Sequence, residues 1–268
     1  MSKKVVVIGG GIIGLCSAYY LQKEGHEVTV IDKSDFTSGA SYVNAGYLTP
    51  SHIISLAAPG MITKGIKWMF NSESPFYVKP RLDSEFLKWS LAFKKSANAK
   101  KVENSIPVIR DINLLSRDLY EDLKASKEFD FHYERKGLLM AYQTDKVGEA
   151  EWEVGERLIE AGLNAEMLTK EEIKKREPNA NLNVKGGVFY DCDGHTTPSD
   201  FMPKMVEHLK NLGVEILAKE EVKDIEISNK IISKIITNKR EIVADEVVLS
   251  AGSWSPLLSK KLGLKHLD

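Results

Sequence analysis

The hydrophobic and polar positions at the start of the chain predict a β-α-β unit. Four consecutive apolar β-formers at 5–8 are typical of a buried parallel strand. Apolar residues within 12–23 approximate one helical face, Gly25 ends this helix, and 26–32 alternates like a second strand. Between the first strand and the helix stand three glycines with the spacing G-x-G-x-x-G, namely Gly9, Gly11 and Gly14.

The glycine spacing predicts a phosphate-binding turn. In such a turn the first glycine permits the bend, the second lets the backbone approach a pyrophosphate, and the third lets helix and strand pack closely. Helix-terminal N–H groups and the helix dipole then favour the anion. Asp32 ends the second strand eighteen positions after Gly14, where a carboxylate can accept hydrogen bonds from ribose hydroxyls. An isolated motif of this kind can be a simple turn, but this context favours an adenine dinucleotide, and the acid disfavours NADP.

The middle of the chain has a different, mixed α+β pattern. The pattern predicts a helix over 107–127, paired strands within 132–143 and a helix over 149–161. It also predicts a helix opened by a Thr169–Glu172 capping box, and a strand over 185–191. Several large apolar residues upstream have helix-like spacings, and we interpret them as core contacts rather than a binding site: Trp68, Met69, Phe70, Phe86, Trp89 and Phe93.

From Gly194 onward the pattern returns to that of the opening unit. A helix starting at 198 or 199 and a strand at 214–217 precede a three-stranded meander over 222–244. A buried strand at 246–252 ends in a glycine turn like the first, so we assign it to the same parallel sheet. The predicted fold class is α/β, with a discontinuous Rossmann-like domain and an interleaved α+β substrate domain. The expected ranges are 1–65 and 195–268 for the first domain, and 66–194 for the second.

Composition narrows the functional classes. Hydrophobic residues make up 43% and charged residues 28%, which is ordinary for a soluble globular protein. The 37 basic side chains nearly balance the 38 acidic ones, so no nucleic-acid surface is predicted. Cys16 and Cys192 form no metal-binding or C-x-x-C spacing, which indicates free thiols and no metal. We find neither a secretory signal nor a run of about 18 apolar residues, and expect a cytoplasmic protein, at most peripheral on the inner face of the cell membrane.

Several segments together resemble a known family. In chain order they are VVVIGGGIIGLCSAYYL, GASYVNAGYLTPSH, AAPGMITKGIKWMF, GHTTPSDF and VVLSAGSWS. They resemble the D-amino-acid-oxidase-type FAD-dependent oxidoreductases, and within that family the D-amino-acid dehydrogenase branch (small subunit type). The glycine fingerprint is shared by many flavoproteins, whereas the second and third segments are much more specific to this branch of the family.

The resemblance implies FAD as the cofactor. It places the pyrophosphate at the three glycines and the AMP ribose on Asp32, where the family more often has Glu. The further residues implied at the cofactor are Lys33, Ser41, Asn44, Ala45, Gly46, Leu48, Val222, Ala251 and Gly252. Asn44 is the preferred polar contact because its amide can donate and accept at once. For Ser41, a hydrogen bond to its own loop is an equal alternative. His52 is a candidate for the substrate side, with a surface or structural place as the alternative.

The implied reaction is oxidative deamination of a D-amino acid. Hydride passes from the substrate Cα to flavin N5, water hydrolyses the imine to a 2-oxo acid and ammonia, and electrons go to a quinone or another acceptor. No strong base is required if the amine arrives neutral, so no Ser-His-Asp arrangement is expected. Oxidation of glycine, sarcosine or proline derivatives is the nearest alternative. An NAD-binding dehydrogenase would show further β-α units after Asp32, which the sequence does not supply.

The family pattern continues beyond the GSWS turn. That continuation supplies an arginine for the substrate carboxylate and a second glycine-rich loop at the flavin. We therefore expect a C-terminally incomplete member, and a catalytically incomplete FAD-binding fragment stays as a second alternative. The oligomeric state is left open, and the catalytic residues stay unknown apart from the candidate His52.

Overall fold

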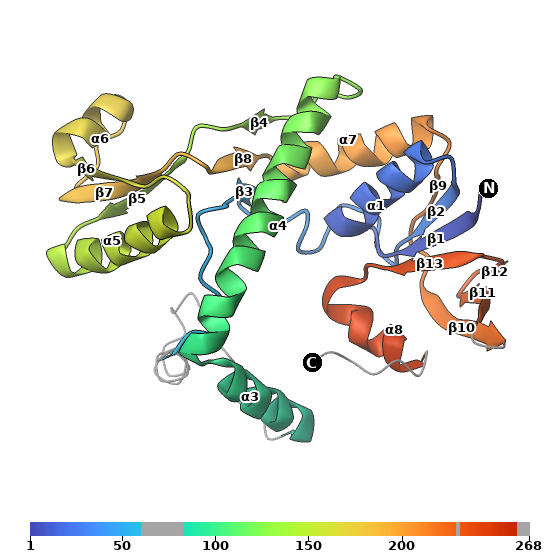
Figure 1. Ribbon diagram of the computed structural model, residues 1–268. Coiled ribbons are helices and arrows are strands. Elements are labelled where there is room, and N and C mark those ends of the chain that lie inside the picture. The colour runs from blue at the N-terminus through green and yellow to red at the C-terminus, as the bar shows by residue number, and fades with distance from the viewer. Residues whose placement is uncertain (60–82, 229–230, 262–268) are drawn as a thin grey trace. The chain divides into compact units, whose positions relative to one another are not determined.

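The computed structural model describes residues 1–59, 83–228 and 231–261. The chain divides into two compact units, and each is described by itself (Figure 1). The first comprises Met1–Gly46, Asp122–Tyr133 and Thr196–Leu267, and the second comprises Tyr47–Glu121 and Glu134–His195. Which ranges serve a cofactor and which a substrate stays a prediction.

A four-stranded parallel sheet forms the centre of the first unit. Its order is β13-β1-β2-β9, with bounds Glu246–Leu249, Lys4–Ile8, Glu27–Ile31 and Glu215–Leu217. The four residues after Lys4 in β1 are at most 4% exposed, because this central strand is covered on both faces. The prediction that the strand near the end of the chain joins the same parallel sheet as the first strand is therefore confirmed.

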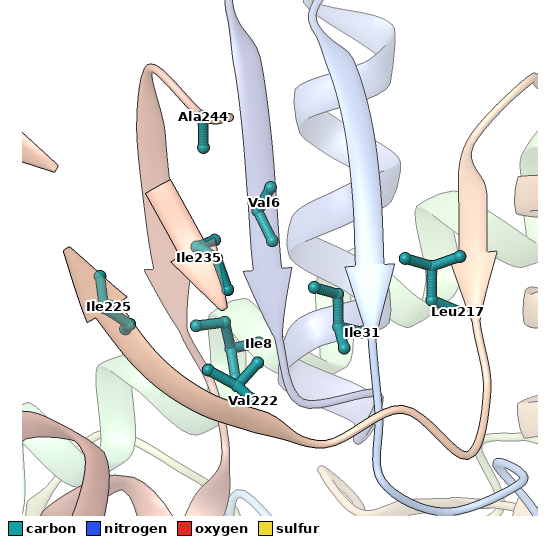
Figure 2. Packing of buried hydrophobic residues seen from close by; sticks show 8 residues of the cluster. All are labelled: Val6, Ile8, Ile31, Leu217, Val222, Ile225, Ile235 and Ala244. Atoms are coloured by element: carbon teal, nitrogen blue, oxygen red, sulfur yellow. The ribbon is translucent and has the colours of Figure 1, made fainter. Parts of the chain in front are cut away.

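Helices cover one face of this sheet and an antiparallel meander covers the other. The helices are α1 (Ile12–Lys23) and α7 (Pro198–Asn211), whose Tyr19 and His208 rings lie 5.9 Å apart. The meander consists of β10 (Val222–Ser228), β11 (Ile231–Thr237) and β12 (Glu241–Ile242). Figure 2 shows the apolar cluster between sheet and meander: Val6, Ile8, Ile31, Leu217, Val222, Ile225, Ile235 and Ala244. After β13 the chain continues into a short 3-10 turn, Gly252–Trp254, and α8 (Ser255–Lys261).

The second unit is built on a separate antiparallel sheet. Its order is β5-β7-β6, with bounds Leu138–Tyr142, Gly186–Tyr190 and Glu166–Thr169. Helix α5 (Asp145–Glu160) packs on β7, and α6 (Lys170–Arg176) begins with the predicted capping box. Two helices precede this sheet, α3 (Ser84–Ser96) and α4 (Ala99–Ser126). Three short strands form another sheet in the order β3-β8-β4: Tyr47–Leu48, Gly194–Thr196 and Tyr133–Glu134.

Two predictions for the middle of the chain are wrong in detail. The expected hairpin within 132–143 does not form, because β5 pairs with β7 while β4 belongs to the β3-β8-β4 sheet. The helix predicted from Pro107 begins at Ala99 instead and contains the proline. The reason is an earlier start signal: the Asn98 side chain accepts a hydrogen bond from Lys101 N at 3.0 Å, as an N-cap does.

Of the aromatic residues of α3, Phe86 and Phe93 are half-buried, whereas Trp89 is not the core residue that the sequence predicts. Trp89 is 51% exposed, and its ring stacks on Phe86 and Phe93 of the same helix, with centroid distances of 6.1 and 5.4 Å. The other three members of the predicted group, at 68–70, lie outside the described residues.

Candidate functional site

The turn between β1 and α1 requires glycine at two positions for internal reasons. Gly9 has φ +110°, and a Cβ there would lie 2.5 Å from the carbonyl oxygen of Ser250. A Cβ on Gly14 would lie 1.9 Å from the carbonyl oxygen of Gly9. The first glycine thus lets the Ser250 turn approach, and the second lets α1 pack on the end of β1.

Gly11 differs from the other two glycines of the motif. Its φ is −72°, which any residue can adopt, and a Cβ would meet only the Ser41 side chain, with Oγ at 3.1 Å. Backbone conformation does not explain this glycine, and among the described residues the only close contact of an added Cβ would be the one with the Ser41 hydroxyl. Apart from that one side chain, the absent Cβ leaves room at the helix N-terminus, which suits the close approach of a bound group.

The N-terminus of α1 presents backbone amides to that space. Ile12 N donates to Ser41 Oγ at 3.0 Å, and Gly10 N donates to Asp32 Oδ2 at 2.7 Å. The amides of Gly11 and Ile13 have no acceptor among the described residues. Unpaired amides at the positive end of a helix dipole form an anion-binding site. Ser41 therefore bonds the helix terminus rather than its own loop.

Asp32 is held at the end of β2 by two amides. Its Oδ2 accepts from Gly10 N, and its Oδ1 accepts from Ser34 N at 2.7 Å. Each carboxylate oxygen has a second acceptor position, so the group can also bind a hydroxyl. The next residue, Lys33, places its Nζ 4.1 Å from the ring centroid of Trp254, which is half-exposed beyond β13.

Asn44 stabilises the loop that follows. Its Nδ2 donates to the Ala40 carbonyl at 2.9 Å, and its Oδ1 accepts from Gly46 N at 2.7 Å. Gly46 has φ +72°, and its carbonyl oxygen accepts from Thr196 N at 2.9 Å. The side-chain amide that sequence reasoning offered to a ligand is thus used inside the loop, while the neighbouring Ala45 is exposed.

The remaining predicted residues of the first unit lie at the carboxyl end of the sheet and in the meander. Ser250 Oγ donates to the carbonyl oxygens of Ile8 and Gly9 at 3.1 and 3.0 Å, which ties the Ala251–Gly252 turn to the glycine turn. The side chain of Val222 is 8% exposed and lies beside Ile8 (Figure 2). Val222 can therefore contact a ligand only through its main chain.

Leu48 and His52 belong to the second unit. Leu48 pairs with Gly194 in the β3-β8 ladder. His52 is exposed, and its Nδ1 lies 3.1 Å from Ser51 Oγ. Ser51 Oγ also lies 2.6 Å from Asp193 Oδ2, and both of these residues are at most 2% exposed.

These last three residues are not a nucleophilic triad. Asp193 bonds Ser51, whereas in a Ser-His-Asp triad the acid bonds the histidine. Because the single hydroxyl proton of Ser51 points at Asp193, the hydroxyl can only accept from His52. The network therefore assigns the proton of a neutral His52 to Nδ1 and leaves Nε2 as the acceptor. Sequence reasoning missed Asp193, since no local pattern relates it to a serine 142 residues earlier.

Neither thiol is prepared for nucleophilic chemistry. Burial raises the pKa of Cys16 to about 12. Burial, together with the neighbouring Asp193, also raises the pKa of Cys192 to about 12. Both side chains therefore stay protonated at neutral pH.

A parallel sheet with helices on one face, an open glycine at a helix N-terminus and an acid ending the second strand define a dinucleotide-binding protein. Residues 4–267 match the model of the FAD dependent oxidoreductase family, and the chain belongs to this family. It is similar to D-amino acid dehydrogenase of Helicobacter pylori, with 36% identity over 97% of this chain and 62% of the relative. The protein of the same name from Vibrio atlanticus is 33% identical over 97% of this chain and 64% of the relative.

Solved structures show the same fold. Glycine oxidase from Geobacillus kaustophilus matches with a TM-score of 0.70 at 21% identity, covering 98% of this chain and 60% of that one. The chain thus spans about three fifths of the length of the relatives it matches.

Proposed function

We propose that this protein binds FAD at the β1–α1 turn and oxidises D-amino acids. The observation that carries the activity is the 36% identity to a D-amino acid dehydrogenase over nearly the whole of this chain. The support for the cofactor comes from the turn itself: an added Cβ on Gly11 would meet only the Ser41 side chain, and the adjacent amides have no acceptor among the described residues.

The proposed contacts follow from the groups available. The amides of Gly11 and Ile13 bind the pyrophosphate, and Asp32 accepts from the ribose hydroxyls. Val222 contributes its main chain at the adenine side, and Lys33 lies at the same end of the sheet. The other proposed contacts are Ser41, Asn44, Ala45, Gly46, Leu48, Ala251 and Gly252. Of these, Ser41 and Asn44 act mainly by shaping the wall of the site, because their side chains are used in internal bonds.

FAD held by these residues would supply the two-electron chemistry, in which the Cα hydrogen of the amino acid leaves as hydride. The protein holds the amino acid and receives its ammonium proton, since only a neutral amine can give an imine. We assign that proton to Nε2 of His52, the acceptor left by the Ser51 hydrogen bond. Water then hydrolyses the imine to a 2-oxo acid and ammonia, and the two electrons pass to a quinone or another acceptor.

A spectroscopic experiment tests cofactor and substrate class separately. The purified protein is titrated with FAD, and the bound flavin is then mixed anaerobically with D-amino acids, their L-enantiomers, glycine, sarcosine and proline. We expect a perturbed flavin spectrum and bleaching by D-amino acids, with no bleaching by the L-enantiomers. Free FAD with the same amino acids is the control.

Each other outcome has a distinct meaning. Bleaching by glycine, sarcosine or proline instead of D-amino acids would favour the alternative substrates. Bound flavin that no amino acid bleaches would refute the proposed activity and favour a catalytically incomplete FAD-binding protein. Absence of flavin binding would refute the site itself.

A further inference from the structure

Phe36 has an unusual backbone conformation for a large buried residue. Its φ is +67°, in the left-handed region that glycine adopts far more readily than a bulky side chain does. Among the described residues, Lys127 and Lys219 are the only others that have such an angle without being glycine, and both are exposed, whereas Phe36 is 7% exposed. Strain of this kind persists only where the surrounding structure holds the residue in place, and it is concentrated at functional sites.

The ring of Phe36 lies against the glycine turn. A Cβ added to Gly10, which is not one of the three motif glycines, would lie 2.0 Å from Cε1 and 2.5 Å from Cδ1 of that ring. The backbone of Gly10 does not itself require glycine, since its φ is not positive. Because a buried ring has little room to move aside, it is the contact with Phe36 that excludes a side chain at position 10.

Hydrogen bonds connect Phe36 to the acid at the end of β2. The Phe36 amide donates to Ser34 Oγ at 3.1 Å, and the Ser34 amide donates to Asp32 Oδ1 at 2.7 Å. The other oxygen, Asp32 Oδ2, accepts from Gly10 N at 2.7 Å, and the Phe36 ring closes the circle at Gly10. The carboxylate and the glycine turn are therefore fixed to one another through Phe36.

We propose that Phe36 is a positioning residue that preorganises the cofactor site. Its ring holds the turn and Asp32 in the arrangement that the pyrophosphate and the ribose require, so that little binding free energy is lost in ordering the loop. A strained backbone at Phe36 and a missing side chain at Gly10 both disfavour folding, and this one contact accounts for both. The inference rests on the FAD binding proposed above and adds a residue that the glycine motif does not include.

A double-mutant cycle with Gly10→Ala and Phe36→Ala tests the proposal. Gly10→Ala alone should raise the Kd for FAD at least about tenfold, because the new Cβ displaces the ring. In the Phe36→Ala background the same change should cost less than about threefold, since no ring is there to displace. Phe36→Ala by itself should raise the Kd by about threefold or more, because the bound flavin must then order the loop. Quenching of flavin fluorescence measures the Kd, and urea denaturation of the flavin-free proteins measures their stability.

Leu209→Ala is the matched control for lost stability. Leu209 is fully buried near the C-terminal end of α7, where Gln22 Nε2 of α1 donates to the Leu212 carbonyl at 3.0 Å. The length of α1 separates this end from the glycine turn. Leu209→Ala should lower the free energy of unfolding about as much as Phe36→Ala does, because both changes empty a buried position. It should leave the Kd of the folded protein within about twofold of the parent value, since distant sites act independently.

The outcomes separate this inference from the proposed function. FAD binding by the parent with equal affinity in folded Phe36→Ala, an equal cost of Gly10→Ala in both backgrounds, or an equal rise in Kd for Leu209→Ala would each overturn the inference alone. Coupling in urea denaturation without coupling in FAD binding would make the contact merely structural, which also overturns it. A parent protein that binds no FAD would refute the site itself and the role of Phe36 with it. If Gly10→Ala does not fold, the comparison of Phe36→Ala with Leu209→Ala decides.

Discussion

The substitution Gly11→Ala separates cofactor binding from folding. At this position the backbone suits alanine, and the new Cβ would meet only the Ser41 side chain, 3.1 Å from Oγ. Ala is a poorer N-cap than Gly by about 0.5–1 kcal/mol, while the loss of glycine freedom in the unfolded chain stabilises by about 0.4–1 kcal/mol. We therefore expect the free energy of unfolding to change by less than about 1 kcal/mol.

Flavin affinity should respond quite differently. The added methyl group lies beside the α1 amides that have no acceptor in the described part of the chain, so the pyrophosphate must move away from them. We expect the Kd for FAD to rise at least about tenfold, equivalent to about 1.4 kcal/mol. Urea denaturation of the flavin-free protein measures the first quantity, and quenching of flavin fluorescence measures the second.

Gly14→Ala is the matched control. Its Cβ would lie 1.9 Å from the Gly9 carbonyl oxygen, a backbone atom that cannot move away without disturbing β1. This variant should lose more than about 2 kcal/mol of stability. Unchanged FAD affinity in a folded Gly11→Ala protein would refute the placement of the pyrophosphate, and equal destabilisation by both changes would refute the packing argument.

Three further predictions concern titratable groups. Asp32→Asn should weaken FAD binding and lower the free energy of unfolding by about 1–3 kcal/mol, because one amide loses its acceptor; an unchanged flavin titration would contradict the ribose contact. Because the pKa values of Cys16 and Cys192 are raised, both thiols should react slowly with a thiol reagent at neutral pH. The free energy of unfolding should fall as the pH rises above about 8.5, because the thiols then ionise in the unfolded chain but not in the folded one. Fast labelling of the folded protein would contradict this. Glu128 has a lowered pKa, chiefly through the hydrogen bond from Lys23, so it contributes stability above about pH 4.3 that is lost on acidification. Glu128→Gln should flatten that part of a thermal-unfolding profile, and an unaltered profile would rule the contribution out.

The parts of the fold encoded by short local patterns were predictable from sequence. The strand–turn–helix at 4–23 and its end signal Gly25 lie within 22 residues, and the predicted helix bounds are confirmed. The strand at 186–190 and the capping box at Thr169 are of the same kind. Each depends on neighbours a few positions away, which a single sequence displays.

Most parts that depend on distant partners were not predictable; the pairing of β1 with β13 is the exception, because both strands are apolar runs that end in a glycine turn. Gly137 does turn the chain, with φ +78°, but its amide bonds the Asp193 carbonyl instead of closing a hairpin. The Ser51–Asp193 hydrogen bond joins residues 142 positions apart, and no sequence pattern predicts it. Within the candidate site, the glycines and Asp32 follow from one contiguous motif. The hydrogen bonds of the Asn44 side chain within its own loop depend on the backbone conformation of that loop, which the sequence does not predict.

The pairing of β1 with β13 has a consequence for folding during synthesis. Ile8 lies opposite Leu249, so the central strand must wait for more than two hundred further residues to be translated before its second neighbour exists. Ser250, which ties the two turns together, is made equally late. A ribosome-bound chain stopped before residue 246 should therefore expose one edge of β1 to chaperones and proteases, and should not retain flavin.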